Sequence, residues 1–598
     1  MKRNIAFLLA VVMAFAVLSA CGAGNKNAGP ADTGAVAKED SSGSADTSDS
    51  SAGKWPDYLN LQDGDAYLPI VKEGMGNDIT LTLAIVQPVN GSDWKDLWIG
   101  KFYEKYMNVH FKVEQIIETG LAERKNLMFA SNDLPDVMMN MGLSPNEIMK
   151  YGVMDGQLMD LEPYIDPELT PDLRYWYDNR ADIRGATTTP DGKIYTLGGV
   201  GDPKDEAAGC RVFTDQRWLD ACGLELPKTL DEFLNMLRAY KDADVNGVGK
   251  ENVVPMAAGF NFLNVEYFIL NAYGYLTNNY VNNRGYSPAI RNNEAVIPAN
   301  DTKIYREVLK TIKTMFDEGL LYQNYFMAPE DGVEVNAVVL DKRAGVYGQP
   351  IYVIGYDDWK YWVGLHPLTS SWNDTPKWHT QDATSIGHFA LSAKNKYPEL
   401  CMRFVNSYYR RNGMGRFLWV GPRNGSEEAM GVAGVKWYDD LNDYEFVEAE
   451  WPEGVNDLWT YLMVVQGPMP GFGATGNTLD IQIAYKENYV LSPPQPNEKT
   501  FNLENPDWFY RASLYENSAP YFTTNFPGIY YLDEDTVIKM DDLVAVIKPY
   551  VDEQFSAFIT GRRPMEEIDA FHEELKGMGI DELEGIYKQI WANYQGSN

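Results

Sequence analysis

Three oxygen-bearing side chains alternate along one short stretch of the sequence, at Asp242, Asp244 and Asn246. Gly247 follows them and allows a sharp turn, and Val248 can then offer its backbone carbonyl oxygen. Carboxylate, amide and carbonyl oxygens are the ligands that hard divalent cations prefer, and calcium takes about six to eight of them. The spacing matches the first half of an EF-hand loop and predicts a calcium site.

The second half of this stretch departs from the EF-hand pattern. Its twelfth position is Val253, where an EF-hand has glutamate, so Glu251 at the tenth position is the residue that could close the coordination shell. An Asx-rich turn without metal is the alternative. We predict a structural Ca²⁺ ion whose ligands come from Asp242, Asp244, Asn246, Val248 and Glu251.

A second group with chemistry of its own is the thiol of Cys21, near the N-terminus. An apolar run over residues 5–18 precedes it and is too short for a membrane span, which needs roughly 20 residues. The run ends in Leu18-Ser19-Ala20-Cys21, which resembles the lipobox of bacterial lipoproteins. The resemblance implies that residues 1–20 are a signal peptide and that Cys21 carries fatty acyl chains such as palmitate. An ordinary signal peptide with an incidental cysteine is the alternative.

Composition limits the partners and predicts the organisation of the chain. Residues 21–54 are mostly small and polar, so they cannot bury enough apolar surface to fold and are predicted to be a disordered tether. The formal net charge of -34 repels polyanions and argues against nucleic-acid binding. A chain of 598 residues exceeds what one hydrophobic core holds, so residues 55–598 are expected to form two lobes.

The other cysteines do not form a recognisable framework. Cys210, Cys222 and Cys401 are an odd number without paired metal spacing, so buried free thiols are the favoured interpretation. A Cys210–Cys222 disulfide stays open, because sequence alone does not fix the geometry that such a bond needs.

Strand and helix patterns alternate in the first third of the chain. Apolar and β-branched residues predict strands over 79–86, 109–116 and 136–139. Helical spacing predicts helices over 96–106 and 121–131. This alternation is typical of an α/β lobe with a largely parallel sheet.

A second alternating block begins with a predicted strand over 211–214 and a helix over 215–222. Thr229 and Glu232 then form the capping box of a further helix. Two apolar stripes at helical spacing predict C-terminal helices that pack on a core, and they run from Ile568 to Met578 and from Leu583 to Tyr594.

Four segments, in this order, resemble characteristic segments of family 1 extracellular solute-binding proteins. They are Phe129–Val137, Asp191–Tyr195, Trp218–Phe233 and Phe558–Gly561. Leu197-Gly198 departs from the pattern, because a proline is common there. The resemblance covers nearly the whole mature chain and points to the LplA-like lipoproteins of carbohydrate ABC importers.

The resemblance implies an α/β, periplasmic-binding-protein-like fold within residues 55–598, in which crossing hinge segments join two lobes around a ligand cleft. It implies that the chain binds an oligosaccharide without catalysis and delivers it to the membrane subunits of an ABC importer. The expected location is the extracellular face of the membrane, with the lipid anchor holding a monomer there. A similar calcium loop in these proteins supports the predicted Ca²⁺ site.

Aromatic residues make up 13% of the chain, which suits a sugar ligand. Sugar rings present apolar faces that pack on aromatic rings, and hydroxyl groups that bind amides and carboxylates. Such residues mix after the first strand, where α/β sheets place ligands, and in two later polar stretches. Core packing is the alternative for each tryptophan. The predicted ligand-binding residues are Asn90, Asp93, Trp94, Tyr195, Trp372, Trp378, Asp382 and Trp419.

Other classes of function fit the sequence less well. A secreted glycoside hydrolase would use two carboxylates, which are too abundant here to be a signal, and no GxSxG, HExxH or P-loop motif occurs. His366, His379 and His388 fit no standard zinc spacing, so packing is favoured for them. A peptide or other small solute as ligand, and a surface adhesion or signalling role, stay open.

Overall fold

The computed structural model contains two four-stranded sheets, each with hydrophobic cores of its own. The chain divides into two units, Met1–Lys54 and Trp55–Asn598, and both sheets belong to the second unit. The structure describes residues 54–62, 67–76, 78–89, 91–201, 212–262, 265–277, 284–329, 332–348, 354, 356–379, 384–410, 418, 421–422, 425–431, 436–438, 443–445, 461–467, 471–474, 517 and 519–597.

The sheet of the first lobe has the order β12-β3-β1-β2. Its strands are β1 (Thr80–Gln87), β2 (His110–Ile117), β3 (Val137–Met139) and β12 (Phe389–Leu391). β1 pairs in parallel with both β2 and β3, and β12 runs antiparallel to β3. Because β2 and β3 lie on opposite sides of β1, the carboxyl ends of β1 and β3 form a topological switch point, where α/β sheets bind ligands.

Alternate residues of β1 face two different cores. Leu83 belongs to the core that contains α1 (Trp98–Tyr106), and Ala84 belongs to the core that contains α2 (Leu121–Ser131). The period of two follows from strand geometry, and it explains why the strand is apolar along most of its length. The strands and helices predicted from the sequence in this lobe are confirmed, with bounds shifted by two residues at most.

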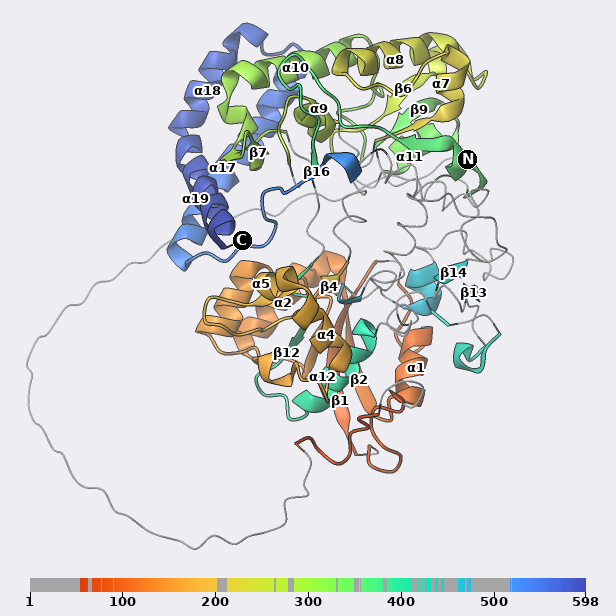
Figure 1. Ribbon diagram of the computed structural model, residues 1–598, viewed down its shortest axis with the longest axis vertical. Helices are drawn as coiled ribbons and strands as arrows, with labels where there is room; N and C mark the ends of the chain where they lie inside the picture. Colours follow the sequence, from red (N-terminus) through yellow and green to blue (C-terminus); the bar gives the residue numbers. More distant parts are fainter. Residues whose placement is uncertain are drawn as a thin grey trace, which may run out of the picture. The chain divides into compact units, whose positions relative to one another are not determined.

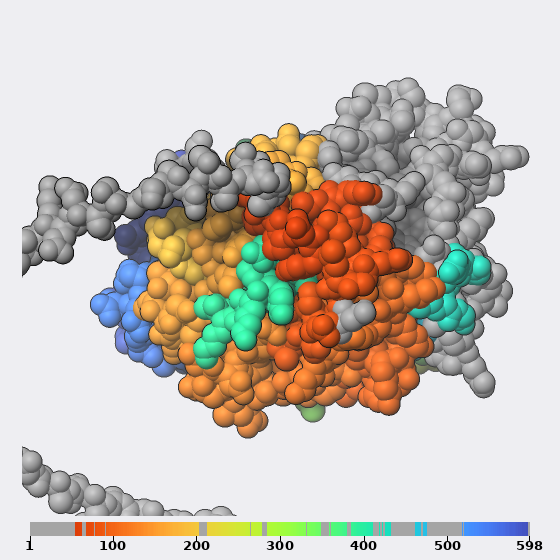
Figure 2. Space-filling model, turned by 90° about the horizontal axis from the view of Figure 1, so that it is seen from below, coloured from red at the N-terminus to blue at the C-terminus, as the bar shows by residue number. Residues whose placement is uncertain are grey.

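A segment from much later in the chain completes the first lobe. The helix α12 (Pro398–Asn406) lies against N-terminal residues, and Figure 2 shows this green segment beside the red and orange ones. Arg403 on α12 is fully buried and donates to the backbone carbonyls of Asn60 at 3.0 Å and Leu169 at 3.1 Å. A buried guanidinium is tolerated when carbonyls satisfy it in this way.

The sheet of the second lobe has the order β10-β5-β9-β6. Its strands are β5 (Phe213–Asp215), β6 (Val254–Ala257), β9 (Ala344–Tyr347) and β10 (Trp362–Gly364). β6 and β9 are parallel, and the other two pairs are antiparallel. This sheet is therefore mixed.

The helix α8 (Leu230–Ala243) begins at the predicted capping box. Thr229 accepts a hydrogen bond from the backbone N–H of Glu232 at 3.1 Å, and the Glu232 carboxylate accepts from the Thr229 N–H at 3.1 Å. Such a box satisfies two N–H groups that a helix start would otherwise leave without partners. The preceding helix α7 (Gln216–Cys222) also matches its prediction.

Three C-terminal helices pack on the second lobe beside α10 (Thr302–Asp317), as Figure 1 shows in blue and green. They are α17 (Glu534–Ile559), α18 (Ile568–Gly577) and α19 (Ile580–Ser597). The predicted apolar stripes of α18 and α19 face the second-lobe core, which confirms their interpretation as packing surfaces.

The chain passes between the two lobes three times, from β3 to β5, from β10 to β12 and from α12 to α17. Short parallel ladders join the segments at these passages. β4 (Gly199–Val200) pairs with β15 (Gly473–Ala474), and β11 (Trp378–His379) pairs with β16 (Phe522–Thr523).

No helix in the described part of the chain is both long and apolar enough to span a membrane. Cys222 and Cys401 are free thiols, and burial raises the pKa of Cys401 to about 12. Cys21 and Cys210 lie outside the described residues, as do the predicted signal peptide and nearly all of the predicted tether.

Candidate functional site

The loop after β1 contains three of the predicted ligand-binding residues. Asn90 lies outside the described residues. Asp93 is exposed, with its carboxylate 3.7 Å from Lys95 Nζ. Trp94 is only 9% exposed and packs in the first-lobe core, with its ring centroid 5.5 Å from that of Tyr103. In this structure the Trp94 ring supports the loop and offers no open face to a ligand.

Two glutamines that the sequence analysis did not select hold this loop in place. Gln115 Oε1 accepts the backbone N–H of Trp94 at 2.8 Å, and Gln115 Nε2 donates to the backbone carbonyl of Ser92 at 3.1 Å and to Gln87 Oε1. Ser92 Oγ in turn donates to the carbonyl of Val464 at 3.0 Å. Gln87 ends β1, and Gln115 lies near the end of β2. A polar residue near the end of a predicted strand is the sequence signal that could have identified them.

Tyr195 and Trp378 also lie in hydrophobic cores. Tyr195 is 3% exposed, donates its O–H to Asp191 at 2.8 Å and packs so closely on Gly152 that a Cβ atom there would come within 2.7 Å of the ring. Trp378 is 2% exposed and packs edge-on against Phe268. Neither ring is accessible to a ligand in this structure. Asp382 and Trp419 lie outside the described residues.

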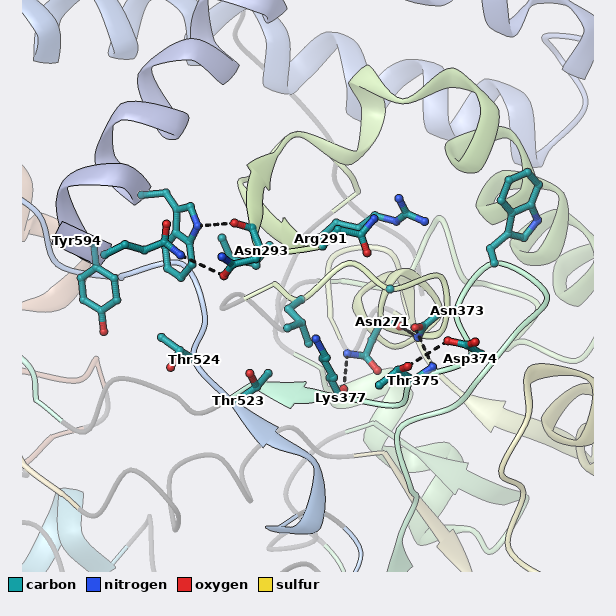
Figure 3. Close-up of a pocket in the computed structure, with 17 residues that line it drawn as sticks. Asn271, Arg291, Asn293, Asn373, Asp374, Thr375, Lys377, Thr523, Thr524 and Tyr594 are labelled. Atoms are coloured by element: carbon teal, nitrogen blue, oxygen red, sulfur yellow. Dashed lines mark hydrogen bonds between the residues drawn. The ribbon is translucent and has the colours of Figure 1, made fainter. Parts of the chain in front are cut away.

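Among the predicted residues that the structure describes, Trp372 lines a cavity. The cavity has a volume of about 530 Å³ and belongs to the second lobe (Figure 3). It lies among the end of α9 (Glu266–Ala272), the hairpin of β7 (Ala289–Arg291) and β8 (Glu294–Val296), residues 372–377, residues 523–524 and the end of α19. Ligand pockets have volumes of roughly 300–1,000 Å³, so the cavity can accommodate a small organic ligand.

Hydrogen bonds hold the Trp372 loop against the end of α9. Ser370 Oγ donates to the carbonyl of Ala272 at 2.8 Å and accepts the N–H of Trp372 at 3.2 Å. Asn271 Nδ2 donates to the carbonyl of Lys377 at 3.0 Å, and Asn373 Nδ2 lies 3.4 Å from the carbonyl of Asn271. Figure 3 shows Asn271, Asn373 and Lys377 close together on one side of the cavity. The loop is therefore a fixed wall.

The lining is rich in uncharged hydrogen-bonding groups. Five side-chain amides, three threonine hydroxyls and the Tyr594 hydroxyl combine with the rings of Trp372 and Trp591. The charged side chains of the lining are Arg291, Lys377 and Asp374, which leave one excess positive charge. Such a surface suits a polyhydroxylated, uncharged ligand better than a strongly ionic one.

Two of the three histidines for which the sequence favours packing, His366 and His388, are partly shielded from solvent by the protein. Burial lowers the pKa of His366 and of His388, so both rings are neutral near pH 7. The His388 ring packs on Gly471 at the first-lobe sheet. Within the described residues no group of three His, Cys, Asp or Glu side chains is arranged to hold a metal ion.

The predicted calcium loop follows α8 as a tight turn. Asp244 adopts the left-handed conformation, with φ 42°, and its carboxylate accepts the N–H groups of Val248 at 2.8 Å and Gly249 at 3.1 Å. Asn246 Nδ2 donates to the carbonyl of Lys342 at 2.8 Å, which leaves its own carbonyl oxygen as an acceptor. The Asp244 carboxylate thus makes the turn, and the described residues do not gather the carboxylates of this loop into a group that could hold a metal ion.

Comparison with known proteins gives two curated relatives. The chain is 27% identical over 266 residues to the fructooligosaccharide ABC transporter substrate-binding protein FusA of Streptococcus pneumoniae, covering 44% of this chain and 47% of the relative. It is 26% identical over 284 residues to the lipoprotein LipO of Bacillus subtilis, covering 46% and 50% respectively. The chain thus spans about half the length of the curated relatives it matches. No protein-family model matches it.

Solved structures cover much more of the chain. An extracellular solute-binding protein from Bifidobacterium longum subsp. infantis superposes with a TM-score of 0.67 at 18% identity, over 88% of this chain and 99% of the other. The chain has the fold of ABC-transporter solute-binding proteins. A FusA structure from S. pneumoniae, an EF-hand mutant in complex with fructo-nystose, shares this solute-binding protein fold with a TM-score of 0.63 and 20% identity, over 87% and 100% of the two chains. The fold class predicted from the sequence is confirmed.

Proposed function

We propose that the chain is a lipoprotein that captures an oligosaccharide outside the cell and delivers it to the membrane subunits of an ABC importer. The cavity of the second lobe carries this proposal, because its amides, hydroxyls and aromatic rings are the groups that bind sugars. The solute-binding protein fold and the two transport-related relatives support it. Cys21 would supply the anchor, and the monomer would act at the extracellular face of the membrane.

Capture in this proposal involves no chemical reaction. Contacts of the ligand with both lobes would favour a closed arrangement, and the three passages of the chain between the lobes are where a hinge would bend. The importer would then recognise the closed form.

The contents of the cavity favour binding over hydrolysis. A glycoside hydrolase uses two carboxyl groups, about 5–10 Å apart, on either side of the bond that it breaks. Asp374 is the one carboxylate among the described residues that line the cavity, and it is exposed. We therefore infer that a bound sugar leaves this site intact.

Calcium is proposed as a structural ligand of the turn after α8. The oxygens of Asp242, Asp244, Asn246, Val248 and Glu251 are the ligand atoms, and the EF-hand named for the FusA structure supports a cation in a protein of this fold. When bound, the ion would fix the connection between α8 and β6 and would take no part in sugar capture.

A thermal-shift screen tests the proposed function. The chain without residues 1–21 is mixed with kestose, nystose and linear manno-, xylo-, galacto- and glucooligosaccharides, and with oligogalacturonate and alginate trisaccharide. A ligand that binds the folded state alone raises the melting temperature, by an amount that grows with its concentration. We expect at least one saccharide to do so and dipeptides, tripeptides and nucleotides to have no effect. A rise with peptides alone would contradict the proposal.

A further inference from the structure

The C-terminal helix α19 forms one wall of the second-lobe cavity. Trp591 Nε1 donates to the backbone carbonyl of Asn293 at 3.0 Å, and Gln595 Nε2 donates to Asn293 Oδ1 at 3.0 Å. Asn292 and Asn293 form the two-residue turn between β7 and β8, both with positive φ. Asparagine tolerates this conformation, and the two bonds from α19 then fix the turn at the edge of the cavity (Figure 3).

The opposite wall presents a buried acceptor without a partner. Asn271 is 5% exposed and uses its Nδ2 to hold the carbonyl of Lys377, but its Oδ1 accepts no hydrogen bond from the described residues. An unsatisfied buried acceptor destabilises a protein, so such atoms commonly receive a donor from water or a ligand. Because Asn271 lines the cavity, a ligand hydroxyl can supply that donor.

Aromatic rings stand on both sides of the cavity. Tyr594 stacks on Trp591 with centroids 5.6 Å apart and planes 21° apart, and Trp372 packs on the core while Lys303 Nζ lies 5.1 Å from its ring. Figure 3 shows Tyr594 on the side of α19 and Asn271 on the side of the 372–377 loop. A ring-shaped ligand between them would meet apolar faces and amide groups together, as sugars require.

The cations of the lining are partly engaged with the protein. Arg291 Nε lies 3.5 Å from the carbonyl of Tyr273, and its guanidinium lies 5.5 Å from the Tyr275 ring. Asp374 balances the charge of one of the two cations. The lining therefore gives an anionic ligand no strong advantage over a neutral one.

We propose that this cavity holds one uncharged sugar unit of the captured oligosaccharide. Asn271 Oδ1 accepts a sugar hydroxyl, and the last turns of α19, through Tyr594 and Gln595, form the wall that selects the unit. The ligand class in this inference rests on the proposed function. The assignment of the C-terminal helix to the site goes beyond it and rests on the cavity itself.

Isothermal titration calorimetry on five forms of the chain tests the inference, with the neutral and acidic oligosaccharides of the thermal-shift screen as probes. Tyr594→Ala removes one aromatic wall, and Gln589→Ala alters an exposed residue of the same helix that does not line the cavity. A chain that stops after Asn593 lacks Tyr594 and Gln595, and a chain that stops after Gln595 is its control. We expect Tyr594→Ala and the chain that stops after Asn593 to bind the neutral saccharide at least tenfold more weakly than the parent. The two controls should bind it with the affinity of the parent.

The possible results distinguish the inference from the proposed function. Equal affinity in all five forms would place the sugar elsewhere and overturn the inference, while leaving oligosaccharide capture in place. Binding of acidic oligosaccharides alone would overturn the assignment of an uncharged unit. If no saccharide binds any form, the proposed function itself fails. Melting temperatures of the variants, equal to that of the parent, show that a loss of affinity is local.

Discussion

Trp591 donates the N–H of its indole ring to the backbone carbonyl of Asn293, 3.0 Å away and 298 residues earlier in the chain. Trp591 is 5% exposed, so this hydrogen bond is shielded from water. The bond ties the C-terminal helix to the turn of the β7–β8 hairpin, and both elements line the same cavity. The shape of the cavity therefore depends on residues that are far apart in the chain.

Trp591→Phe is expected to loosen this connection. The variant loses the N–H donor and part of the ring, which should lower the free energy of unfolding by about 1–3 kcal/mol. Saccharide affinity should also fall, because the asparagines of the turn are no longer fixed at the cavity. Trp218→Phe is the control, since Trp218 is equally buried, lies outside the lining and its indole N–H has no partner. Chemical denaturation and calorimetry measure both effects, and unchanged affinity in Trp591→Phe would contradict the expectation.

Glu266 gives the second lobe a pH-dependent stability. It is 1% exposed, and burial raises its pKa from 4.5 to about 7, although Arg284 and a 2.6 Å hydrogen bond from Tyr325 oppose the shift. Between these pH values the folded chain keeps a proton that the unfolded chain has released. The contribution of Glu266 to stability is therefore full below pH 4.5 and is lost as pH rises to 7, by about 3 kcal/mol.

Glu266→Gln should reduce this loss, because a neutral amide keeps an acceptor for Tyr325 and does not titrate. Glu334→Gln is the matched control, since Glu334 also accepts a hydrogen bond from a tyrosine, Tyr322, at 2.6 Å but is only partly buried. Urea denaturation at several pH values from 4.5 to 8 measures how steeply the free energy of unfolding falls with pH in each protein. Parallel slopes for the parent and Glu266→Gln would show that Glu266 does not titrate in this range.

Calcium is predicted to raise the melting temperature of the parent, and a chelator to lower it. Asp244→Asn should keep the turn, because asparagine tolerates a positive φ and its carbonyl can accept an N–H of the loop, but it removes a charged ligand. The variant should therefore melt at the same temperature with calcium and with chelator. If neither calcium nor chelator changes the melting temperature of the parent, and elemental analysis finds no metal in it, the loop is an Asx turn without a calcium ion.

Lipid attachment at Cys21 is a prediction from the sequence alone, because this residue lies outside the described structure. Expression of the full chain in a bacterium should give a membrane-bound protein whose N-terminal peptide begins at Cys21 with added acyl mass. Cys21→Ser should abolish the added acyl mass. The variant protein should then either leave the membrane or keep its signal peptide. Mass spectrometry that finds an unmodified N-terminus at another position would contradict the prediction.

Local patterns predicted the elements of the fold well. The Thr229–Glu232 capping box marks the start of α8, and the predicted helix over 121–131 has the bounds of α2, because caps and helical periodicity are properties of neighbouring residues. The apolar run of β1 likewise shows that both of its faces are covered. The mixed order of the second sheet was not predictable in this way, since it depends on which distant strands pair.

The cavity shows where sequence reasoning fails. Five stretches, between residues 271 and 595, line it, and no local pattern connects them. Tyr594 belongs to a helical stripe whose other members pack on the core, so the stripe alone assigned it to packing. Trp94 and Trp378 have neighbours typical of a sugar site, but their burial is decided by the packing of distant residues such as Tyr103 and Phe268.

Recovery of an intact ligand is the most direct measurement of the central claim, that the chain binds an oligosaccharide and releases it unchanged. The chain without residues 1–21 is incubated for a day at a stoichiometric ratio with the saccharide that gives the largest thermal shift, and the protein is then denatured. Chromatography with mass detection of the supernatant should recover the saccharide at its original length, and calorimetry should show saturable binding. Accumulation of shorter saccharides, absent from a sample incubated without protein, would contradict the claim and make the chain a hydrolase.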